Sequence, residues 1–140
     1  MTETTIGTTG RNGWNIGLWA AQVLLAAFYG FAGFNKVSQT MESLGAMGMS
    51  YATDFPELLT RFIGTMEILG AIGIILPALT RIMPRLTPLA ALGFSVIQVL
   101  AMGVHLSRGE LGVLPMNLVL LALSLFVLWG RERQAPISAR

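Results

Sequence analysis

The chain has 140 residues, of which 54% are hydrophobic and 11% are charged, and its mean hydropathy is +0.67. A soluble globular domain carries about 25% charged residues, so this composition excludes that class and indicates one membrane-embedded domain. The basic residues lie at the ends of apolar stretches, an arrangement that favours a membrane protein over one that binds nucleic acid. The chain has no cysteine, which excludes disulfides, thiolate nucleophiles and thiolate metal sites.

Four apolar stretches without Lys or Arg follow one another along the chain, at residues 14–34, 62–79, 88–106 and 111–130. Each is long enough to cross a hydrocarbon core of about 30 Å as a helix, at about 1.5 Å per residue. The sequence therefore predicts an all-α fold, an integral membrane four-helix antiparallel bundle over residues 14–131. We expect a disordered cytoplasmic tail at 1–13 and a second cytoplasmic tail at 132–140.

The first stretch has an alternative interpretation as a cleavable signal peptide. Its apolar run is longer than the hydrophobic region of such a peptide, and it ends at Gly33-Phe34-Asn35-Lys36 without a small-x-small cleavage site. We therefore expect this stretch to remain as a membrane anchor.

The connection between the first and second stretches is long and rich in methionine, with Met41, Met47 and Met49. Thioethers bind Cu(I), but flexible apolar methionines in an interfacial lid are the simpler interpretation. The connection ends at Asp54-Phe55-Pro56-Glu57, whose Asp-x-x-Glu spacing is that of a capping box and predicts a helix start near Asp54.

The basic residues predict the orientation of the bundle. Four spans place both termini and the middle connection on one side, and that side carries Arg11, Arg81, Arg85, Arg131, Arg133 and Arg140. By the positive-inside rule this side is cytoplasmic. We expect a multi-pass protein of a bacterial-type cytoplasmic (inner) membrane, with both termini in the cytoplasm.

Polar and small residues within the stretches recur every 3.5 residues or so, as the interior positions of a helix bundle do. Polar groups in hydrocarbon are costly and should face the interior. The interior positions so predicted are Gln22, Ala26, Tyr29, Gly33 and Lys36; Thr60, Gly64, Glu67, Ala71 and Ile74; Ala91, Ser95, Gln98, Met102 and His105; and Asn117, Leu121, Ser124 and Leu128.

Antiparallel order places the most polar of these in the outer half of the membrane, namely Tyr29, Lys36, Glu67, Gln98, His105 and Asn117. The inner half of the same faces offers mainly Ala, Ser, Leu and Ile. The sequence therefore predicts a one-sided pocket that opens outward under the segment 41–51. Its expected walls are Phe28, Phe34, Phe62, Phe94 and Met102. Lys36 and Arg108 near its mouth favour an anionic or carbonyl-bearing head group.

Glu67 is the central candidate of this pocket, because a carboxylate in hydrocarbon costs about 3 kcal/mol. It must therefore be neutral or have a partner, and Lys36, His105 and Tyr29 are the candidates across the bundle. Arg61 is not an obvious local partner, since six residues rotate it roughly 120° around the helix. Glu67 either has a proton-transfer, ligand or catalytic role or only joins helices by hydrogen bonds.

The other candidates also have structural alternatives. Lys36 and Arg61 either contribute to the site or extend to the interface, and His105 lies near that interface, where water solvates it. We assign candidate catalytic roles to Glu67, His105 and Lys36. Candidate ligand-binding roles fall to Tyr29, Arg61, Gln98, Met102 and Asn117. One His and one buried Glu are too few for zinc or haem, so we expect no metal; no cofactor is evident, and a quinone fits the pocket.

Several motifs together carry a family resemblance. They are Gly30-Phe31-Ala32-Gly33-Phe34-Asn35-Lys36, then the Arg-x-x-Gly-x-x-Glu-x-x-Gly pattern of Arg61, Gly64, Glu67 and Gly70, followed by Gly73, Pro77, His105 and Arg131. In these the chain resembles the DoxX-like family of small four-helix membrane proteins. The resemblance implies that fold, and it implies association with quinone-linked redox enzymes, since the family is named for a subunit of a thiosulfate:quinone oxidoreductase. Other relatives act as membrane accessory or assembly factors, and the absence of cysteine argues against a thiol relay here.

Three functions remain open from the sequence. The first is a redox-associated membrane subunit that binds a quinone or similar lipophile, with Glu67 exchanging the proton that quinone chemistry requires. The second is a stand-alone membrane enzyme that uses Glu67 as general acid or base. The third is a non-catalytic assembly factor whose polar residues fix helix register. The expected partners are the lipid bilayer and a lipophilic small molecule, with a homo-oligomer or a larger membrane complex left open.

Overall fold

The computed structural model describes residues 2–140, with side chains from Asn12 onward. Its helices are α1 (Thr2–Ser38), α2 (Met41–Ala46), the 3₁₀ turn η1 (Ser50–Thr53), α3 (Glu57–Thr80), α4 (Leu86–Ser107), the 3₁₀ turn η2 (Leu111–Val113), α5 (Leu114–Trp129) and the π-helical turn η3 (Gly130–Gln134). The tail expected at residues 1–13 lies mostly in the part of the chain whose side chains are not described, so it stays a prediction.

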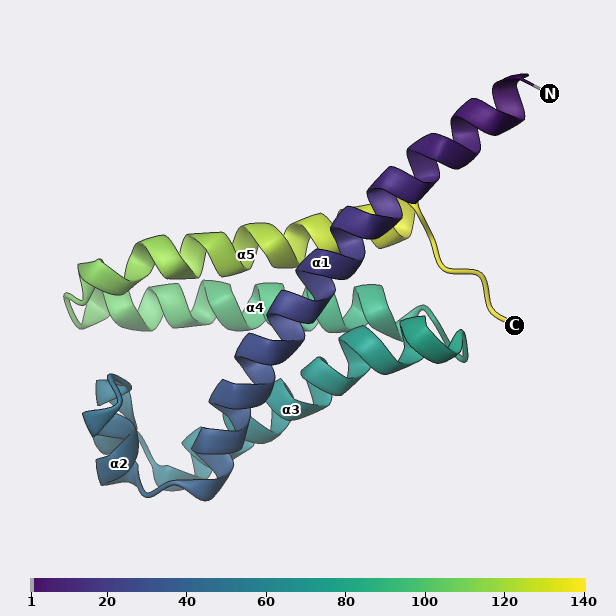
Figure 1. Cartoon of the computed structure of the whole chain (residues 1–140). Coiled ribbons are helices and arrows are strands. Elements are labelled where there is room, and N and C mark those ends of the chain that lie inside the picture. Colours follow the sequence, from purple (N-terminus) through teal and green to yellow (C-terminus); the bar gives the residue numbers. More distant parts are fainter. Residues whose placement is uncertain (1) are drawn as a thin grey trace.

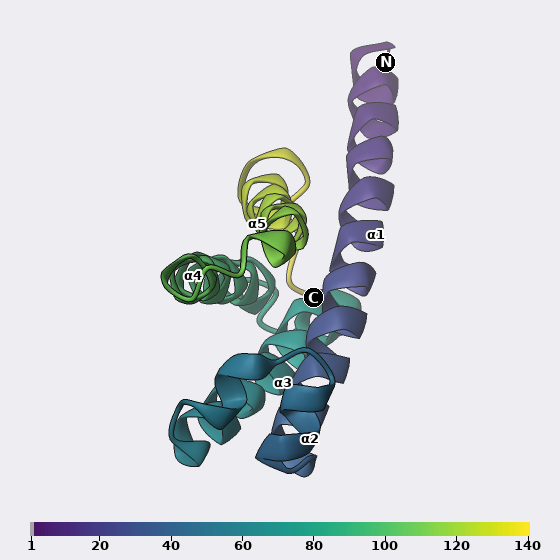
Figure 2. The ribbon, with the colours of Figure 1, turned by 90° about the vertical axis from the view of Figure 1, so that its left-hand side faces the viewer.

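Four helical segments are long and apolar enough to cross a membrane, at Asn12–Ser38, Glu57–Thr80, Leu86–Ser107 and Leu111–Gln134. They contain the four stretches expected from the sequence, and they confirm the all-α membrane bundle. In Figure 1, α4 and α5 lie side by side in opposite directions, and α1 runs diagonally past them. Figure 2 shows α3 between α1 and α4, with α2 beside the ends of α1 and α3.

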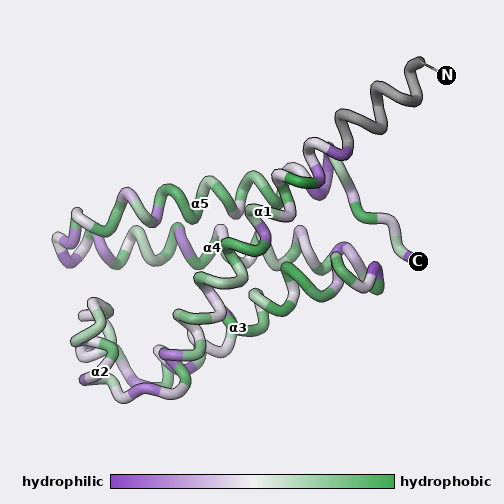
Figure 3. Tube along the Cα trace, viewed as in Figure 1, coloured by the Kyte–Doolittle hydropathy of each residue, from purple (hydrophilic) through white to green (hydrophobic). Residues whose placement is uncertain are grey.

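The distribution of polar and apolar side chains is the reverse of that in a soluble protein. Gln22, Glu67 and Ser124 are each no more than 1% exposed, whereas Leu24 and Val99 on the outer faces are more than half exposed. Figure 3 shows long hydrophobic runs on all four spanning helices. Apolar outer faces of this kind are suited to contact with lipid, and the 3.5-residue pattern of interior positions is confirmed at its most polar members.

Glycine brings α1 and α3 into close contact. A Cβ atom added at Gly33 would lie 2.6 Å from the Gly64 carbonyl oxygen, and one added at Gly64 would lie 2.6 Å from Lys36 Cβ. A similar contact joins α3 to α4, since a Cβ at Gly70 would lie 2.5 Å from the Phe94 ring. Helices in lipid associate through such close packing of small residues, so these glycines set the position of α3 against both neighbours.

A proline inside α3 leaves one backbone carbonyl without its helical donor, and side chains of two other helices bind α3 at this level. Pro77 has no N–H to donate to the Gly73 carbonyl, four residues earlier. Thr87 Oγ1 donates to that oxygen over 3.4 Å, and Gln22 Nε2 donates to the Ile74 oxygen over 2.7 Å. Because an unpaired carbonyl in hydrocarbon is costly, these two bonds hold α1 and α4 to α3 at this level.

Candidate functional site

A buried ion pair lies at the close contact between α1 and α3. Lys36 Nζ, near the end of α1, donates to Glu67 Oε1 in the middle of α3. Their side chains are 11% and 1% exposed. Of the partners considered for Glu67, the structure selects Lys36, which lies so close because Gly33 and Gly64 let the two helices touch. The pair cancels two charges that would each be costly alone in a bilayer.

Arg61, expected as a ligand-binding residue, is placed on the end of α1. Its Nη1 donates to the carbonyl oxygens of Lys36 (2.9 Å) and Gln39 (2.6 Å), and its Nη2 donates to Glu57 Oε1 at 2.9 Å. The last carbonyls of a helix have no partner within the helix and carry partial negative charge. Arg61 therefore caps α1 just beyond the ion pair, and these donors serve the protein itself.

A second polar pair joins α1 to α4. Gln98 Nε2 donates to the Tyr29 hydroxyl, and the Tyr29 ring stacks on Phe94 with centroids 3.9 Å apart and planes 12° apart. Within the described part of the chain, two buried oxygens of this region have no hydrogen-bond partner, Gln98 Oε1 and Thr60 Oγ1. The sequence predicts that Tyr29 and Gln98 both face the interior of the bundle, and in the structure their side chains are in contact.

His105 lies at the edge of the bundle, under the segment that follows α2. Its Nδ1 is 3.1 Å from Glu110 Oε1, and its ring meets Tyr51 edge to face with centroids 6.2 Å apart. Tyr51 also lies near the ion pair, with its ring centroid 5.9 Å from Lys36 Nζ. The prediction that the methionine-rich segment covers this end is supported by these contacts of Tyr51, which reach both α1 and α4.

Ionic contacts fasten the same cover to the connection between α4 and η2. Ser50 donates to Glu110, and Arg108 pairs with Asp54 and with Glu110. The hydrogen bond from Ser50, then those from His105 and Arg108, lower the pKa of Glu110. The Asp54 hydrogen bond, followed by the bonds to Glu110, raises the pKa of Arg108. Both groups therefore stay ionised, and the contact persists, around neutral pH.

The predicted capping box at this point is wrong. Asp54 ends η1, and α3 begins at Glu57 with Pro56 as its N-cap and without a side-chain cap. A residue that precedes proline is pushed out of the helical conformation, so Phe55 cannot continue a helix that starts at Asp54. The Asp54 carboxylate instead pairs with Arg108.

The remaining predicted residues divide between interior and surface. Asn117 is 7% exposed, Phe94 is 1% exposed, and Met102 is half-buried. Phe28, Phe34 and Phe62 are 37%, 63% and 59% exposed, so their prediction as pocket walls is wrong. Each lies one or two positions from an interior residue, and one position is already a turn of about 100° around a helix.

At the opposite end of the bundle the structure contains a polar cluster that the sequence did not indicate. Arg131 is 3% exposed. Its Nε donates to Gln22 Oε1 at 2.7 Å, and its Nη1 donates to Asn15 Oδ1 at 2.8 Å and to the Ala135 oxygen at 2.9 Å. The guanidinium also lies 5.7 Å from the Trp19 ring centroid. We call this the Arg131 end, and the end with the ion pair the Lys36 end.

Two cavities of about 280 and 290 Å³ lie at the Arg131 end, and Glu67 lines neither of them. Both cavities lie at the end opposite to the predicted outer pocket, which stays a prediction. In the sequence Arg131 is a topological charge and a member of the family motif, and an arginine after an apolar span gives no local signal of its partners. Gln22, an interior residue at the same level, was the one hint of a partner there.

Within the described residues, no group of three or more His, Asp and Glu side chains lies close enough together to hold a metal ion. The Lys36 end thus offers proton-exchanging and hydrogen-bonding groups, and no cluster of metal ligands. Chemistry at this end by the residues described would be acid-base chemistry or the binding of a polar head group.

Comparison with known proteins identifies a family. Neither the curated proteins nor the solved structures searched yielded a significant match. The model of the DoxX-like family matches residues 20–127, a range that runs from α1 to α5 and includes Lys36, Glu67 and Gln98. With four membrane-spanning helices and a match over most of its length, the chain belongs to the DoxX-like family.

Proposed function

We propose that the protein binds the polar head of a lipophilic molecule, such as a quinone, beside Tyr29 and Gln98 at the Lys36 end, as a redox-associated membrane subunit. The observation that carries the proposal is the buried Gln98 Oε1, which has no partner in the described part of the chain. Most buried polar groups in proteins have a hydrogen-bond partner. An acceptor without one favours a ligand that donates a hydrogen bond there.

The chemistry of the pair suits a quinone and its reduced form. The Tyr29 hydroxyl accepts from Gln98 and keeps its own proton, which it donates to a carbonyl oxygen. Gln98 Oε1 accepts a hydroxyl proton from the reduced form. Interchange of the two amide atoms, whose assignment follows from the network, leaves the same combination of donor and acceptor. The stacked Phe94 ring supplies the apolar surface that binding sites of this kind need.

The ion pair supplies the proton exchange in this proposal. Glu67 and Lys36 share a hydrogen bond, and the pair holds one transferable proton, which Lys36 carries or passes to Glu67 along that bond. The pair gives this proton to the reduced ligand, and a proton from the aqueous side then replaces it. If the protein is instead a stand-alone membrane enzyme, the same two groups act on the substrate. Glu67 is then the general acid or base, and Lys36 sets its protonation state.

A specific observation favours a second candidate, a non-catalytic membrane assembly factor. Glu67 is 1% exposed and paired, and the two cavities described lie at the other end. A pair closed in this way fixes the register of α1 against α3 without any ligand. The two candidates differ in the role of Gln98. In the lipophile-binding subunit Gln98 Oε1 accepts a hydrogen bond from the ligand, whereas in the assembly factor it has no ligand to bind.

Binding measurements separate the candidates. We expect Gln98→Leu and Tyr29→Phe to weaken binding of a ubiquinone analogue to the protein in nanodiscs by about tenfold each, the effect of one buried hydrogen bond of about 1.4 kcal/mol. Ser95→Ala is the matched control. Ser95 is also buried on α4, but its hydroxyl bonds only to Ala91 in its own helix. Equal affinity in all four proteins, or no binding at all, would leave the assembly factor.

Glu67→Gln tests the proton-transfer role separately. Glutamine keeps the shape of glutamate and accepts the Lys36 hydrogen bond, but it cannot exchange a proton. We expect this variant to fold and to bind the analogue, while proton uptake on chemical reduction of the bound analogue becomes slower. A rate of proton uptake equal to that of the unmodified protein would exclude Glu67 from the transfer.

We also propose that the Arg131 end faces the cytoplasm of a bacterial-type inner membrane. Arg81, Arg85, Arg131, Arg133 and Arg140 lie at this end. At the Lys36 end, basic residues are diluted by acidic partners, as in the pair of Arg108 and Asp54. An excess of Lys and Arg marks the cytoplasmic side of a membrane protein.

Single-cysteine labelling tests this orientation. Because the chain has no cysteine of its own, a maleimide reacts only with the introduced residue. Ala46→Cys, on the exposed end of α2, should react with a membrane-impermeant maleimide in intact cells. Ala139→Cys should react only after permeabilisation. Both positions are exposed, whereas Ala135, at 2% exposure, is too buried to serve. The reverse pattern of labelling would invert the topology.

A further inference from the structure

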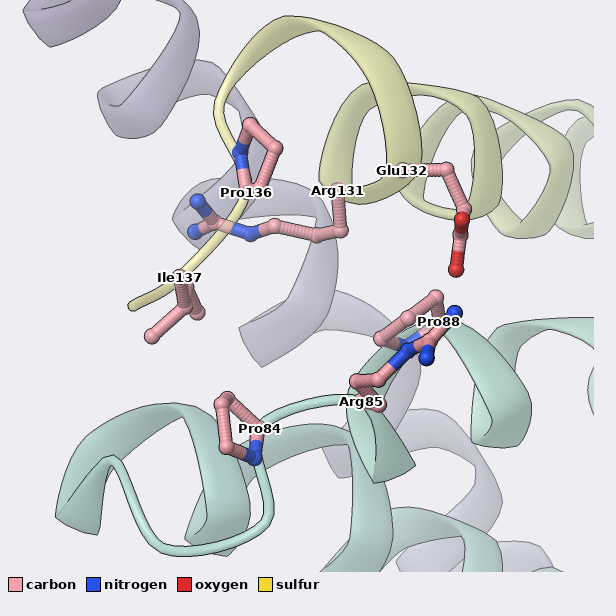
Figure 4. A pocket seen from close by; sticks show the side chains of 7 residues that line it. All are labelled: Pro84, Arg85, Pro88, Arg131, Glu132, Pro136 and Ile137. Carbon is pink, nitrogen blue, oxygen red and sulfur yellow. The ribbon is translucent and has the colours of Figure 1, made fainter. Parts of the chain in front are cut away.

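The cavity of about 280 Å³ at the Arg131 end lies between the start of α4 and the C-terminal segment. Its lining is Pro84, Arg85, Pro88, Arg131, Glu132, Pro136 and Ile137. Figure 4 shows the Arg131 side chain extending along one wall toward Pro136 and Ile137, with Arg85 and Pro88 on the opposite wall. The site described at the Lys36 end uses none of these residues, so this cavity is a separate feature.

Arg131 has an unused hydrogen-bond donor. Its Nε and Nη1 are occupied by Gln22, Asn15 and the Ala135 oxygen. Its Nη2 is buried and has no partner among the residues that the structure describes. Arginine is charged at all physiological pH values, and a buried charged donor without an acceptor is costly. The missing partner is therefore a hydrogen-bond acceptor, and a negatively charged acceptor would form the strongest bond with the guanidinium.

The rest of the lining suits a phosphate group with an apolar attachment. Arg85 is exposed at the cavity, and its guanidinium adds a second positive charge against the single carboxylate of Glu132. Arginine binds phosphate oxygens through pairs of charge-assisted hydrogen bonds. Pro84 and Pro88 are buried and form an apolar wall beside these charges.

We propose that this cavity binds a phosphate group, supplied by the head of an anionic phospholipid or by a free phosphate, between Arg85 and Arg131. The phosphate accepts from Arg131 Nη2, and the exposed Arg85 side chain, whose guanidinium points toward Glu132 in Figure 4, turns to donate to it as well. The cavity lies at the end of the spanning helices, the level at which lipid head groups meet a membrane protein.

The C-terminal segment packs against Arg131, whose Nη1 donates to the Ala135 oxygen. It is held by bonds from Arg81 Nε to the Ser138 oxygen at 2.7 Å and from the Arg140 N–H to the Arg81 oxygen at 3.1 Å. Pro136 and Ile137 line both cavities and so form the wall between them. Because Nη2 is buried, the phosphate reaches it when Pro136 and Ile137 move aside by a small amount.

Two arginines of this end provide a matched pair of variants. Arg85 lines the cavity, whereas Arg133 carries the same charge close by and lines neither cavity. Both are exposed, so both variants should fold. We expect Arg85→Gln to weaken retention of phosphatidylglycerol by about tenfold, as expected for a hydrogen bond between charged groups. Arg133→Gln should change retention by less than about twofold, as for a screened surface charge.

The experiment uses the full chain, purified in detergent, with phosphatidylglycerol or phosphatidylcholine added and lipid adducts counted by native mass spectrometry. A second arm compares the thermal stabilisation given by inorganic phosphate with that given by chloride at equal ionic strength. If the protein retains phosphatidylglycerol selectively and Arg85→Gln loses this selectivity, the phosphate belongs to a lipid head group. If inorganic phosphate stabilises the protein more than chloride does and Arg85→Gln abolishes this difference, the ligand is a free anion. Equal behaviour of the two lipids together with equal behaviour of phosphate and chloride overturns the proposal, as does an equal loss in the two variants.

Discussion

Lys36→Met is expected to lower the free energy of unfolding of the bundle by about 3–5 kcal/mol, because it leaves the Glu67 carboxylate buried without its cation. The carboxylate has no solvent to turn to, since it is 1% exposed. Glu67→Leu should cost a similar amount, because Lys36 then becomes the unpaired charge. Reversible unfolding in mixed micelles measures both losses.

The double variant Lys36→Met/Glu67→Leu decides what the loss means. Replacement of a buried ion pair by apolar side chains of similar volume is often neutral or stabilising, so we expect the double variant to recover most of the stability. A double variant as unstable as the sum of the two single variants would show that the two charges act independently, against the pairing in the structure.

Gly64→Ala should produce the second large effect, a loss of about 1–3 kcal/mol, which is typical of overpacking in a tight core. The added methyl group would lie 2.6 Å from Lys36 Cβ and 2.9 Å from the Gly33 carbonyl oxygen. Neither neighbour can yield easily, since both belong to the backbone or first side-chain atom of α1. The two helices must therefore separate, which also stretches the pair of Lys36 and Glu67.

Gly93→Ala is the control for that substitution, because Gly93 lies in α4 and a Cβ there would meet no heavy atom within 4 Å. Alanine is the better helix former, by up to about 1 kcal/mol, so this variant should be as stable as the unmodified protein or slightly more so. The same unfolding measurement compares them. Equal losses in Gly64→Ala and Gly93→Ala would mean that the cost arises from helix propensity and not from the contact of α1 with α3.

Local sequence properties determined the spanning helices and their interior faces. Hydropathy over one stretch of chain depends on that stretch alone, so the four spans could be located without their neighbours. The polar residues fell on one face of each helix because every polar group in lipid must avoid the hydrocarbon. Gln22, Glu67 and Ser124, all buried, follow from this argument.

Only the tertiary structure decided which polar groups meet. Periodicity names the interior face of a helix, but the rotation and depth of its neighbour depend on contacts such as those of Gly33 and Gly64. Those contacts chose Lys36 over His105 and Tyr29 as the partner of Glu67, and they left His105 to Glu110.

The same limit explains why the sequence did not reveal the hydrogen-bond partners of two arginines. Arg61 and Arg131 each follow the rule for charges at the end of an apolar span, and their sequence neighbours do not distinguish them. In the fold, Arg61 caps α1, whereas Arg131 turns inward to Gln22 and lines a cavity. An arginine side chain is long enough to reach several partners, so only the positions of the carbonyl and amide oxygens around it, which come from distant parts of the chain, determine what it binds.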